Sequence, residues 1–502
     1  MISADQSGKK QLIKNSIFSL IAWIFPIVLG FVATPILVHG LGAEQYGIFA
    51  IVLGFISYSF TFGIGKVVAK FIPEFMAGGE TDKVSEVISA TLMFSIVIGL
   101  TGFLLLAVLT RTIVVDLLLI SPANQDVAAQ ALYLACAIGF MTMVSQVFQF
   151  VLQGLHRFRD YVILANLSGL LIGIGNIAFV LGGFGVIAIL CWNLIIVSVI
   201  GFLFFDRARK SVSGFKFTFR VPAEMRRSVL RYGGNIILFQ VFANILFIFE
   251  RTSIVRKFGP EALTYYFVPM LLAIYMHGMM GSLVQAMFPV VNELLQDRDK
   301  LVLLYRKATK MLFAIVVFIV ATFICSGKLL LTLWVGPELA EASYELLVIH
   351  SVTFGLIAML IIPLQVSEAF RFSILNAIMT GTWMSISIPL MIYLSDIYNT
   401  EGIALGRLAT VVLTFPLLFF VEWRFLATAQ IRFWLSIVWR AAIACFATIA
   451  FQLLILYVIA ANRITFVAVV GAAGLVYLGL LTLIGYFTKE ERSMARELVL
   501  GR

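Results

Sequence analysis

Apolar residues are grouped into long stretches along the whole chain, and short polar segments separate them. A helix needs about 20 consecutive apolar residues to cross the hydrocarbon core of a membrane. Numbered in chain order, we place about fourteen such spans at 17–38, 48–69, 86–109, 127–152, 161–180, 184–205, 234–257, 265–288, 309–333, 344–364, 372–394, 402–421, 434–459 and 464–487. They lack alternating polarity and are about twice the length of a barrel strand. The pattern predicts an all-α integral membrane protein with 14 transmembrane helices.

Short landmarks in the first half of the chain return in the same order about 215 residues later. The matched pairs are Gly42-Ala43-Glu44 with Gly259-Pro260-Glu261, Pro73 with Pro289, Pro122 with Pro337, Arg157-Phe158 with Arg371-Phe372, and Gly185 with Gly402. A repeat of this length indicates a duplicated half-protein, spans one to six and spans seven to twelve. Because six is even, both halves cross the membrane in the same sense, and we expect them to be related by an axis along the membrane normal.

This repeat predicts two pseudo-symmetric six-helix lobes and a C-terminal appendage. The N-terminal lobe is placed at 1–205, a basic cytoplasmic linker at 206–233, the C-terminal lobe at 234–425, and two extra helices with a cytoplasmic tail at 426–502. A duplicated half in a membrane chain is typical of a transporter whose site lies between the halves. The linker is interpreted as a topology anchor, and the alternative is a docking surface for a cytoplasmic partner.

Composition agrees with a membrane protein, and charge predicts its orientation. Hydrophobic residues make up 61% of the chain and charged residues 12%, with a mean hydropathy of +1.04, outside the soluble range. Most of the 36 Lys and Arg residues fall on segments that are inside the cell if the N-terminus is cytoplasmic. This bias predicts a multi-pass protein of the cell (inner) membrane with both termini in the cytoplasm. The same bias and anionic membrane lipids account for the net charge of +10, so no nucleic acid partner is expected.

The sequence gives no sign of catalysis or of a resident cofactor. The cysteines fall inside separate predicted spans, and their spacing suggests neither a metal site nor a disulfide framework. They are Cys136, Cys191, Cys325 and Cys445. No segment between spans is long enough to form an enzymatic domain. We therefore expect no cofactor, no metal and no enzymatic activity.

Span seven has the clearest polar face. Gln240, Asn244 and Arg251 are spaced so that they lie on one side of a helix. A charged residue at membrane depth is expensive, and it is a candidate for binding substrate. For Arg251 the alternatives are a pair with another helix or snorkelling to water. For Glu250 a structural salt bridge is favoured over ion coupling, and it does not face the same way as Arg251.

Two further polar faces are candidates for substrate contact. Lys66 and Lys70 lie on one face of span two near its cytoplasmic end, where they either attract an anionic group of the substrate or act as ordinary positive-inside anchors. Gln146, Gln149 and Gln153 share a face of span four. Amides offer both a donor and an acceptor, which suits hydroxyl groups of a substrate, and they equally suit contacts between helices.

Two more charged or titratable residues lie inside spans. His277, near the middle of span eight, is a candidate for coupling transport to an ion, and the alternative is a buried neutral histidine. Arg407, near the start of span twelve, is a candidate for substrate contact with the same structural alternative.

Several motifs resemble those of a known family. They are LGAEQYGIFA (41–50), GIGKVVAKFIPEFMA (63–77), Glu250-Arg251, FPVVNELLQDRDKLVLLYRKATK (288–310), WVGPELAEASYELLVIHS (334–351) and GIALGRLATVV (402–412). Together they make residues 12–425 resemble the polysaccharide-type (Wzx-like) lipid-linked oligosaccharide flippases. These flippases are part of the multidrug/oligosaccharidyl-lipid/polysaccharide (MOP) exporter superfamily, which also contains the MATE extruders. The family usually has Asp where this chain has Glu250, a change that keeps the charge.

The resemblance implies a twelve-helix core in two lobes, often with two extra helices. It also implies a flippase that moves a polyprenyl-pyrophosphate-linked oligosaccharide, such as an O-antigen, capsule or exopolysaccharide repeat unit, from the cytoplasmic to the outer leaflet by alternating access. With this cargo, the resemblance implies that Lys66 and Lys70 attract the pyrophosphate and that the glutamines of span four contact sugar hydroxyls. Expected partners are this substrate and membrane lipids, with H⁺ or Na⁺ as candidate coupling ions and a polysaccharide polymerase and a chain-length regulator as candidate protein partners. The alternatives are an ion-coupled multidrug exporter of the same superfamily and, from another class, a membrane glycan polymerase or ligase.

Overall fold

The computed structural model describes most of the chain. The described residues are 27–59, 65–212, 215–285, 291, 294–370, 372, 374–427, 430–458, 462–488 and 491. The first part of span one, the repeat landmarks Pro289 and Arg371, and most of the predicted C-terminal tail lie outside these residues.

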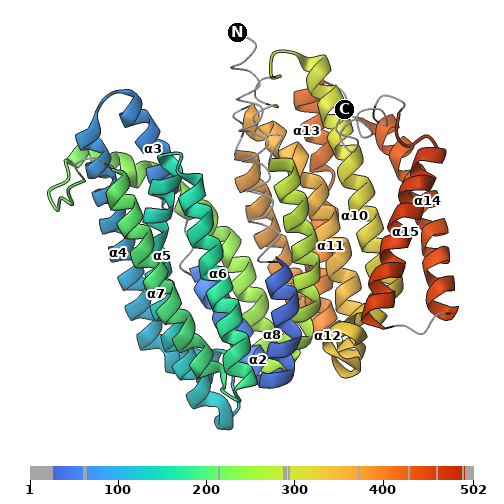
Figure 1. The fold of residues 1–502 in the computed structure, drawn as a ribbon, viewed down its shortest axis with the longest axis horizontal. Coiled ribbons are helices and arrows are strands. Elements are labelled where there is room, and N and C mark those ends of the chain that lie inside the picture. Colours follow the sequence, from blue (N-terminus) through green and yellow to red (C-terminus); the bar gives the residue numbers. More distant parts are fainter. Residues whose placement is uncertain are drawn as a thin grey trace. The chain divides into compact units, whose positions relative to one another are not determined.

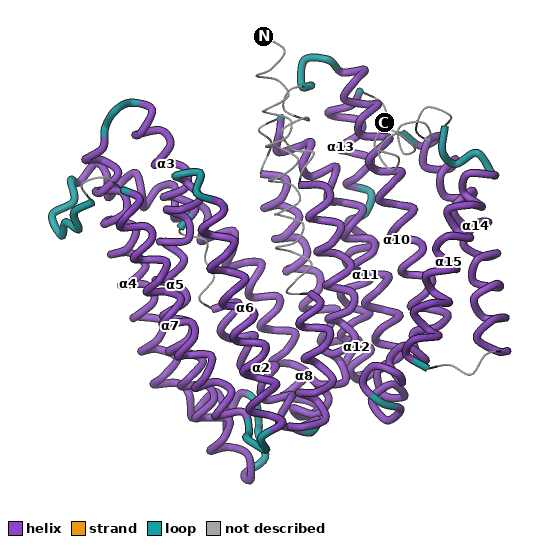
Figure 2. The backbone as a smooth tube through the Cα atoms, viewed as in Figure 1, coloured by secondary structure: helices purple, strands orange, loops and turns teal. Residues whose placement is uncertain are grey.

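Every regular element in the described residues is helical, which confirms the all-α prediction (Figures 1 and 2). An apolar helix at Ile27–Leu41 comes first. The elements that follow are α2 (Ala43–Ser59), α3 (Lys66–Ala77), α4 (Thr81–Thr112), the π-helix η1 (Ile113–Leu117), the 3₁₀-helix η2 (Pro122–Asn124), α5 (Gln125–Gly154), α6 (Phe158–Leu181), α7 (Val186–Ser211), α8 (Ala223–Gln285), α10 (Arg298–Val335), α11 (Pro337–Ala369), α12 (Ile374–Thr414), α13 (Leu417–Leu426), α14 (Ile431–Val458) and α15 (Arg463–Leu483).

Ten helical segments among the described residues are long and apolar enough to cross a membrane. Two of them hold two predicted spans each, because Asn244–Val284 has 41 residues and Ile374–Leu426 has 53. At about 1.5 Å per residue, both exceed the roughly 30 Å hydrocarbon core. Non-helical backbone interrupts α8 at Gly259 and α12 at Tyr398 and Asn399, between the predicted spans. The predicted multi-pass membrane fold is confirmed.

Two pairs of repeat landmarks adopt similar local geometry in both copies. Gly42 and Gly259 both have positive φ, at 78° and 85°. This region favours glycine, and it explains why glycine stands at both helix breaks. Pro122 and Pro337 both stand in the first turn of a helix, where the missing N–H leaves no hydrogen bond unmade. At these two pairs of positions the backbone therefore has similar features, and the duplication itself stays a prediction.

The described chain forms two compact units. The first unit runs up to Phe267 and takes in Thr380–Ile403, and the second takes in Val268–Met379 and the chain from Ala404 onward. Residues 234–267 of the predicted C-terminal lobe therefore pack with helices of the predicted N-terminal lobe. The lobe boundaries themselves stay a prediction, because compactness reports packing rather than repeat symmetry.

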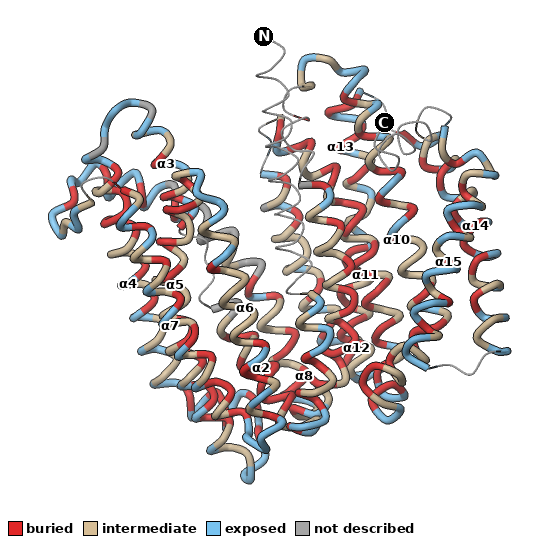
Figure 3. The backbone as a smooth tube through the Cα atoms, in the orientation of Figure 1, coloured by how far each residue is buried: buried red, intermediate tan, exposed pale blue. Residues whose placement is uncertain are grey.

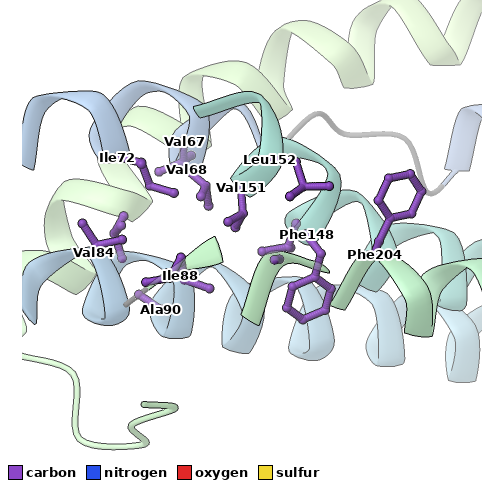
Figure 4. Close-up of a cluster of buried hydrophobic side chains, with 14 of the residues drawn as sticks. Val67, Val68, Ile72, Val84, Ile88, Ala90, Phe148, Val151, Leu152 and Phe204 are labelled. Carbon is purple, nitrogen blue, oxygen red and sulfur yellow. The ribbon is translucent and has the colours of Figure 1, made fainter. Parts of the chain in front are cut away.

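In the first unit, α5 packs against α4 and α7, and α3 packs against α4 and α5 (Figure 1). Their shared core is a cluster of β-branched and aromatic side chains (Figure 4). Val68 and Ile72 of α3 are fully buried in it with Ile88 of α4 and Val151 of α5. Inside a membrane such a cluster stabilises the bundle by close van der Waals packing. Because the cluster buries one face of α3, the opposite face, which carries charged residues, is exposed.

In the second unit, α11 packs against α10, and α14 and α15 pack against each other and against α10. In its most apolar stretch, 67% of the residues of α11 are buried, against 28% in both α14 and α15 (Figure 3). The central position of α11 explains this difference. The exposed apolar side chains of α14 and α15 are suited to face lipid.

Helix α10 begins at a local capping contact. The Asp297 carboxylate accepts a hydrogen bond from the Lys300 backbone N–H at 3.2 Å and lies 2.7 Å from the Lys300 Nζ. The hydrogen bonds from Lys300 hold the pKa of Asp297 below its ordinary value. This N-cap provides an acceptor for one of the amides that have no partner in the first turn.

Candidate functional site

Arg251 is buried inside the first unit, with 6% of its surface exposed. Its Nη1 donates a hydrogen bond to the Ala50 carbonyl oxygen of α2 at 2.8 Å. The guanidinium lies 4.3 Å from the centroid of the Phe267 ring, within the range of a cation–π contact. Gly54 leaves room for it, because a Cβ there would lie 2.7 Å from the Arg251 Nη1. Arg251 therefore contacts another helix, and its role in binding substrate stays a prediction.

Glu250 has a different partner from Arg251, because neighbouring residues in a helix do not face the same way. It is 1% exposed and accepts a hydrogen bond from the Tyr266 hydroxyl. Tyr266 lies beyond the break at Gly259, so this bond joins predicted spans seven and eight within α8. A buried carboxylate that accepts a phenolic hydrogen bond is stabilised against the cost of its burial.

The predicted polar face of span seven is present. The Gln240 Nε2 donates a hydrogen bond to the Asn244 Oδ1 at 2.9 Å. Asn244 is buried at 4% exposure, and Gln240 is half-buried. The two amides and Arg251 thus form a polar stripe on α8 inside the first unit.

Near Gly259, α8 makes further contacts with α2 that the sequence did not predict. A Cβ at Gly47 would lie 1.8 Å from the Pro260 carbonyl oxygen, so the two backbones approach as closely as glycine allows. The Thr264 hydroxyl donates a hydrogen bond to the Ala43 carbonyl oxygen at 2.5 Å. We call this set the Gly259 contact, defined by Gly47, Pro260 and Thr264. Its signal in the sequence was the repeat landmark at Gly42 and Gly259.

Two basic residues just before Gly259 bind other elements of the same unit. The Lys257 Nζ lies 2.6 Å from the Asp396 carboxylate and donates a hydrogen bond to the Ser395 hydroxyl at 2.7 Å. The Arg256 Nη1 donates a hydrogen bond to the carbonyl oxygen of Asp116 in η1 at 3.2 Å. Helix α8 is therefore held at this end by α2, by η1 and by α12.

The candidates of spans two and four lie on two packed helices, α3 and α5. Lys66 and Lys70 are exposed, and the Lys70 Nζ lies 4.9 Å from the Phe71 ring centroid. On α5, the glutamines are half-buried. They are Gln146, Gln149 and Gln153, and the Gln149 Nε2 donates a hydrogen bond to the Ser145 hydroxyl at 3.2 Å. The structure thus brings the predicted basic and amide faces onto neighbouring helices.

In the second unit, His277 and Arg407 converge on one aromatic ring. The Phe354 ring lies 6.0 Å from the His277 ring, edge-on, and 6.0 Å from the Arg407 guanidinium. Arg407 is 4% exposed, and His350, one turn before Phe354 on α11, is fully buried. The sequence flagged His277 and Arg407 separately and did not predict that they share a partner.

No group of His, Cys, Asp or Glu in the described part of the chain could hold a metal ion. The four cysteines are free. What the described residues offer chemically is a set of buried hydrogen-bonding and charged groups that join helices.

The ten helical segments of membrane-crossing length among the described residues show that the chain is a multi-pass membrane protein. Residues 12–295 match the family model described as "Polysaccharide biosynthesis protein". Because the match covers more than half of the chain, the chain belongs to this family of polysaccharide biosynthesis proteins.

In sequence, the chain is similar to a protein of Shigella flexneri named "Putative O-antigen transporter", at 20% identity over 405 residues, 80% of this chain and 95% of that protein. In structure, it is similar to "Lipid II flippase MurJ, inward closed conformation", with a TM-score of 0.75, 15% identity, and 93% and 98% of the two chains covered. An inward-facing MATE family multidrug resistance transporter of the MOP superfamily has a TM-score of 0.66, 18% identity, and coverage of 80% and 97%. The chain therefore shares its fold with a lipid II flippase and with a MATE family transporter of the MOP superfamily, as the resemblance in sequence implied.

Replacing Arg251 with methionine is expected to destabilise the protein by about 1–3 kcal/mol, because the Ala50 carbonyl loses a charge-assisted hydrogen bond while the packing of the stem is kept. A fall of roughly 3–10 °C in melting temperature is expected for the purified chain. Arg111→Met is the matched control, because the Arg111 side chain is 80% exposed and its ion pair with Asp126 is long, at 3.9 Å. Equal melting curves for the two variants would contradict a structural role for the Arg251 contact.

Proposed function

We propose that this chain is a flippase that carries a polyprenyl-pyrophosphate-linked oligosaccharide from the cytoplasmic to the outer leaflet. Membership of a polysaccharide biosynthesis family supports a role in glycan export. The similarity to a protein named as an O-antigen transporter, over 95% of its length, supports a lipid-linked repeat unit as substrate. The fold shared with a lipid II flippase fits the same class of cargo.

The observation that carries the proposal is the polar stripe of α8, Gln240, Asn244 and Arg251. Polar and charged side chains are costly in a hydrocarbon environment, so a pair of amides and a buried guanidinium in an apolar bundle indicate a function. A sugar–pyrophosphate headgroup needs such donors to cross the membrane. We assign Gln146, Gln149 and Gln153 to sugar hydroxyls. We assign Lys66 and Lys70, which are exposed, to the first capture of the pyrophosphate.

Alternating access is part of the proposal, and the Gly259 contact suggests where one gate lies. This contact joins α2, from the predicted N-terminal lobe, to the part of α8 that belongs to the predicted C-terminal lobe. If the lobes rock against each other, this contact must break in one half of the cycle and form again in the other. One hydrogen bond and backbone packing are suited to such reversible opening.

Coupling to an ion is assigned to the second unit. His277 and Arg407 share the Phe354 ring, so a change of charge on His277 alters the field at a buried guanidinium. We propose H⁺ as the coupling ion on this ground. Glu250 is assigned a structural role, because its carboxylate is already engaged by Tyr266.

Transport of a lipid-linked sugar by the purified full chain tests the proposal. Liposomes containing the protein receive a fluorescent polyprenyl-pyrophosphate oligosaccharide in the outer leaflet, and a membrane-impermeant quencher reports how much remains there. We expect protection to rise with protein and with an imposed pH gradient, and to stay at background in empty liposomes. No movement of the sugar lipid under any ion gradient would contradict the proposal.

The second candidate function, export of cationic drugs, is favoured by the fold shared with a MATE transporter. It predicts an acidic binding face, whereas the polar stripe of α8 carries Arg251. Uptake of a cationic dye into the same liposomes, without movement of the sugar lipid, would support this alternative instead.

A further inference from the structure

A groove with a cavity volume of about 730 Å³ lies in the first unit between α4 and the first turns of α8. One wall is apolar and includes Met93, Phe94 and Val97 of α4. The other wall carries Arg226, Arg227 and Arg231. None of the residues proposed above to bind the transported substrate lines this groove.

The basic wall is a firmly held helix face. Met225 and Val229 of α8 are buried in the hydrophobic cluster around Ile88. Residues three or four apart share a helix face, so Met225 and Val229 share the packed face, and Arg227 and Arg231 share a face that is turned away from it. The segment before the helix is also tied to α4, because the Thr218 backbone N–H donates to the Ser89 hydroxyl at 3.2 Å.

The three arginines are available to bind an anion. All are exposed, and within the described chain their guanidinium groups make no hydrogen bond or ion pair. Glu224 lies one turn before Arg227, but it does not line the groove and is close enough to Lys83 to interact with it electrostatically. The groove therefore has three unneutralised positive charges on one wall and an apolar surface on the other.

The apolar wall belongs to a helix that faces lipid. Only 11% of the most apolar stretch of α4 is buried, and Val97 is 61% exposed. Guanidinium groups bind phosphate oxygens in bidentate geometry, and basic residues near a membrane surface are attracted to anionic lipids. A ligand with a phosphate head and a hydrocarbon tail matches both walls at once.

We propose that this groove is a binding site for an anionic phospholipid of the surrounding membrane, with its phosphate held by Arg226, Arg227 and Arg231 and an acyl chain along α4. Two other molecules share part of this chemistry, a polyprenyl pyrophosphate and free inorganic phosphate. The lipid-facing position of α4 favours a bilayer lipid, which reaches the groove without leaving the membrane. The bound lipid would fix the start of α8, the helix that carries the polar stripe.

Lipid binding to the purified full chain tests this site. Native mass spectrometry of protein in detergent measures the affinity for phosphatidylglycerol, for phosphatidylcholine, for a polyprenyl pyrophosphate and for inorganic phosphate. The groove variant is R226Q/R227Q/R231Q. The matched control is R207Q/K216Q/R220Q, which removes the same charge from exposed residues of the same segment outside the groove.

We expect phosphatidylglycerol affinity to fall about 10- to 100-fold in the groove variant, in line with three basic contacts, and to stay within about threefold of the parent in the control. Equal losses in the two variants would overturn the site, because they would show a diffuse charge effect. Preferential binding of the polyprenyl pyrophosphate or of inorganic phosphate, lost in the groove variant, would overturn the assignment to a bilayer lipid.

A second variant tests the site independently in case the triple variant does not fold. Val97→Gln keeps all three arginines and changes a side chain that is already 61% exposed, so the fold is expected to persist. It should weaken phosphatidylglycerol binding about two- to fivefold by removing part of the apolar wall, and leave inorganic phosphate binding unchanged. Unchanged phosphatidylglycerol affinity in this variant would also overturn the site.

Discussion

Replacing Gly47 with alanine is expected to lower transport at least about tenfold and to destabilise the protein by about 1–3 kcal/mol. A Cβ at this position would lie 1.8 Å from the Pro260 carbonyl oxygen and 2.4 Å from its carbon. Both are backbone atoms next to the helix break at Gly259, so no side-chain rotation relieves the clash. Helices α2 and α8 must then separate, which breaks the Gly259 contact. Transport in liposomes and melting of the purified chain measure the two effects.

Gly169→Ala on α6 is the matched control for this prediction. It makes the same chemical change within a helix of the same unit, and a Cβ there would have no atom within 4 Å. It should keep full transport and full stability, because alanine also favours the helix more than glycine does. If Gly47→Ala behaves like Gly169→Ala, the close approach of α2 and α8 has no role in the transport cycle.

A loss of transport without loss of stability would be the more informative form of the result. It would mean that the protein folds but rests in a conformation with the Gly259 contact open. The hydrogen bond from Thr264 to Ala43 and the one from Arg251 to Ala50 join the same pair of helices. Variants at these residues should then shift the same equilibrium in the same direction, since contacts that open together are coupled.

The helices were predictable because hydrocarbon imposes one requirement on every span. A backbone in lipid must satisfy its own hydrogen bonds, so long apolar runs become helices wherever they occur. The breaks within α8 and α12 were also predicted correctly, because each of these apolar runs is too long to cross the membrane as a single helix. The landmark glycines Gly42 and Gly259 marked turns because their positive φ excludes most other residues.

The partners of the candidate residues were not predictable from sequence. Arg251 stood out as a charge in an apolar run, but its acceptor is the Ala50 carbonyl, a group that every residue has. Gly47 was missed because it is one of 38 glycines, and only the position of Pro260 shows that a Cβ does not fit there. The shared ring of His277 and Arg407 depends on a third helix, which periodicity along one helix does not reveal.

Glu422 was not a candidate at all, yet it is expected to be among the most sensitive residues of the second unit. It is fully buried, and three groups donate hydrogen bonds to its carboxylate. They are the Tyr305 hydroxyl at 2.8 Å, the Trp434 Nε1 at 2.7 Å and the Gln430 backbone N–H at 2.9 Å. These donors come from α10, from α14 and from the residue before α14. One carboxylate on α13 thus ties the first of the two extra helices to the core of the unit.

Replacing Glu422 with alanine is expected to destabilise the protein by about 3–5 kcal/mol, because three buried donors lose their acceptor at once. The melting temperature of the purified chain should fall by roughly 10 °C. Glu345→Ala on α11 is the control, an exposed carboxylate of the same unit whose loss should change stability by no more than about 0.5 kcal/mol.

A double variant tests whether the donors act through this carboxylate. Tyr305→Phe removes one donor, and the stability that it costs in the parent chain should largely disappear in the Glu422→Ala background, because the two residues share one hydrogen bond. Additive losses in that double variant would show that the carboxylate does not organise the three helices. Transport per folded molecule should remain near the parent value, because this network joins α14 to the bundle and lies outside the polar stripe of α8.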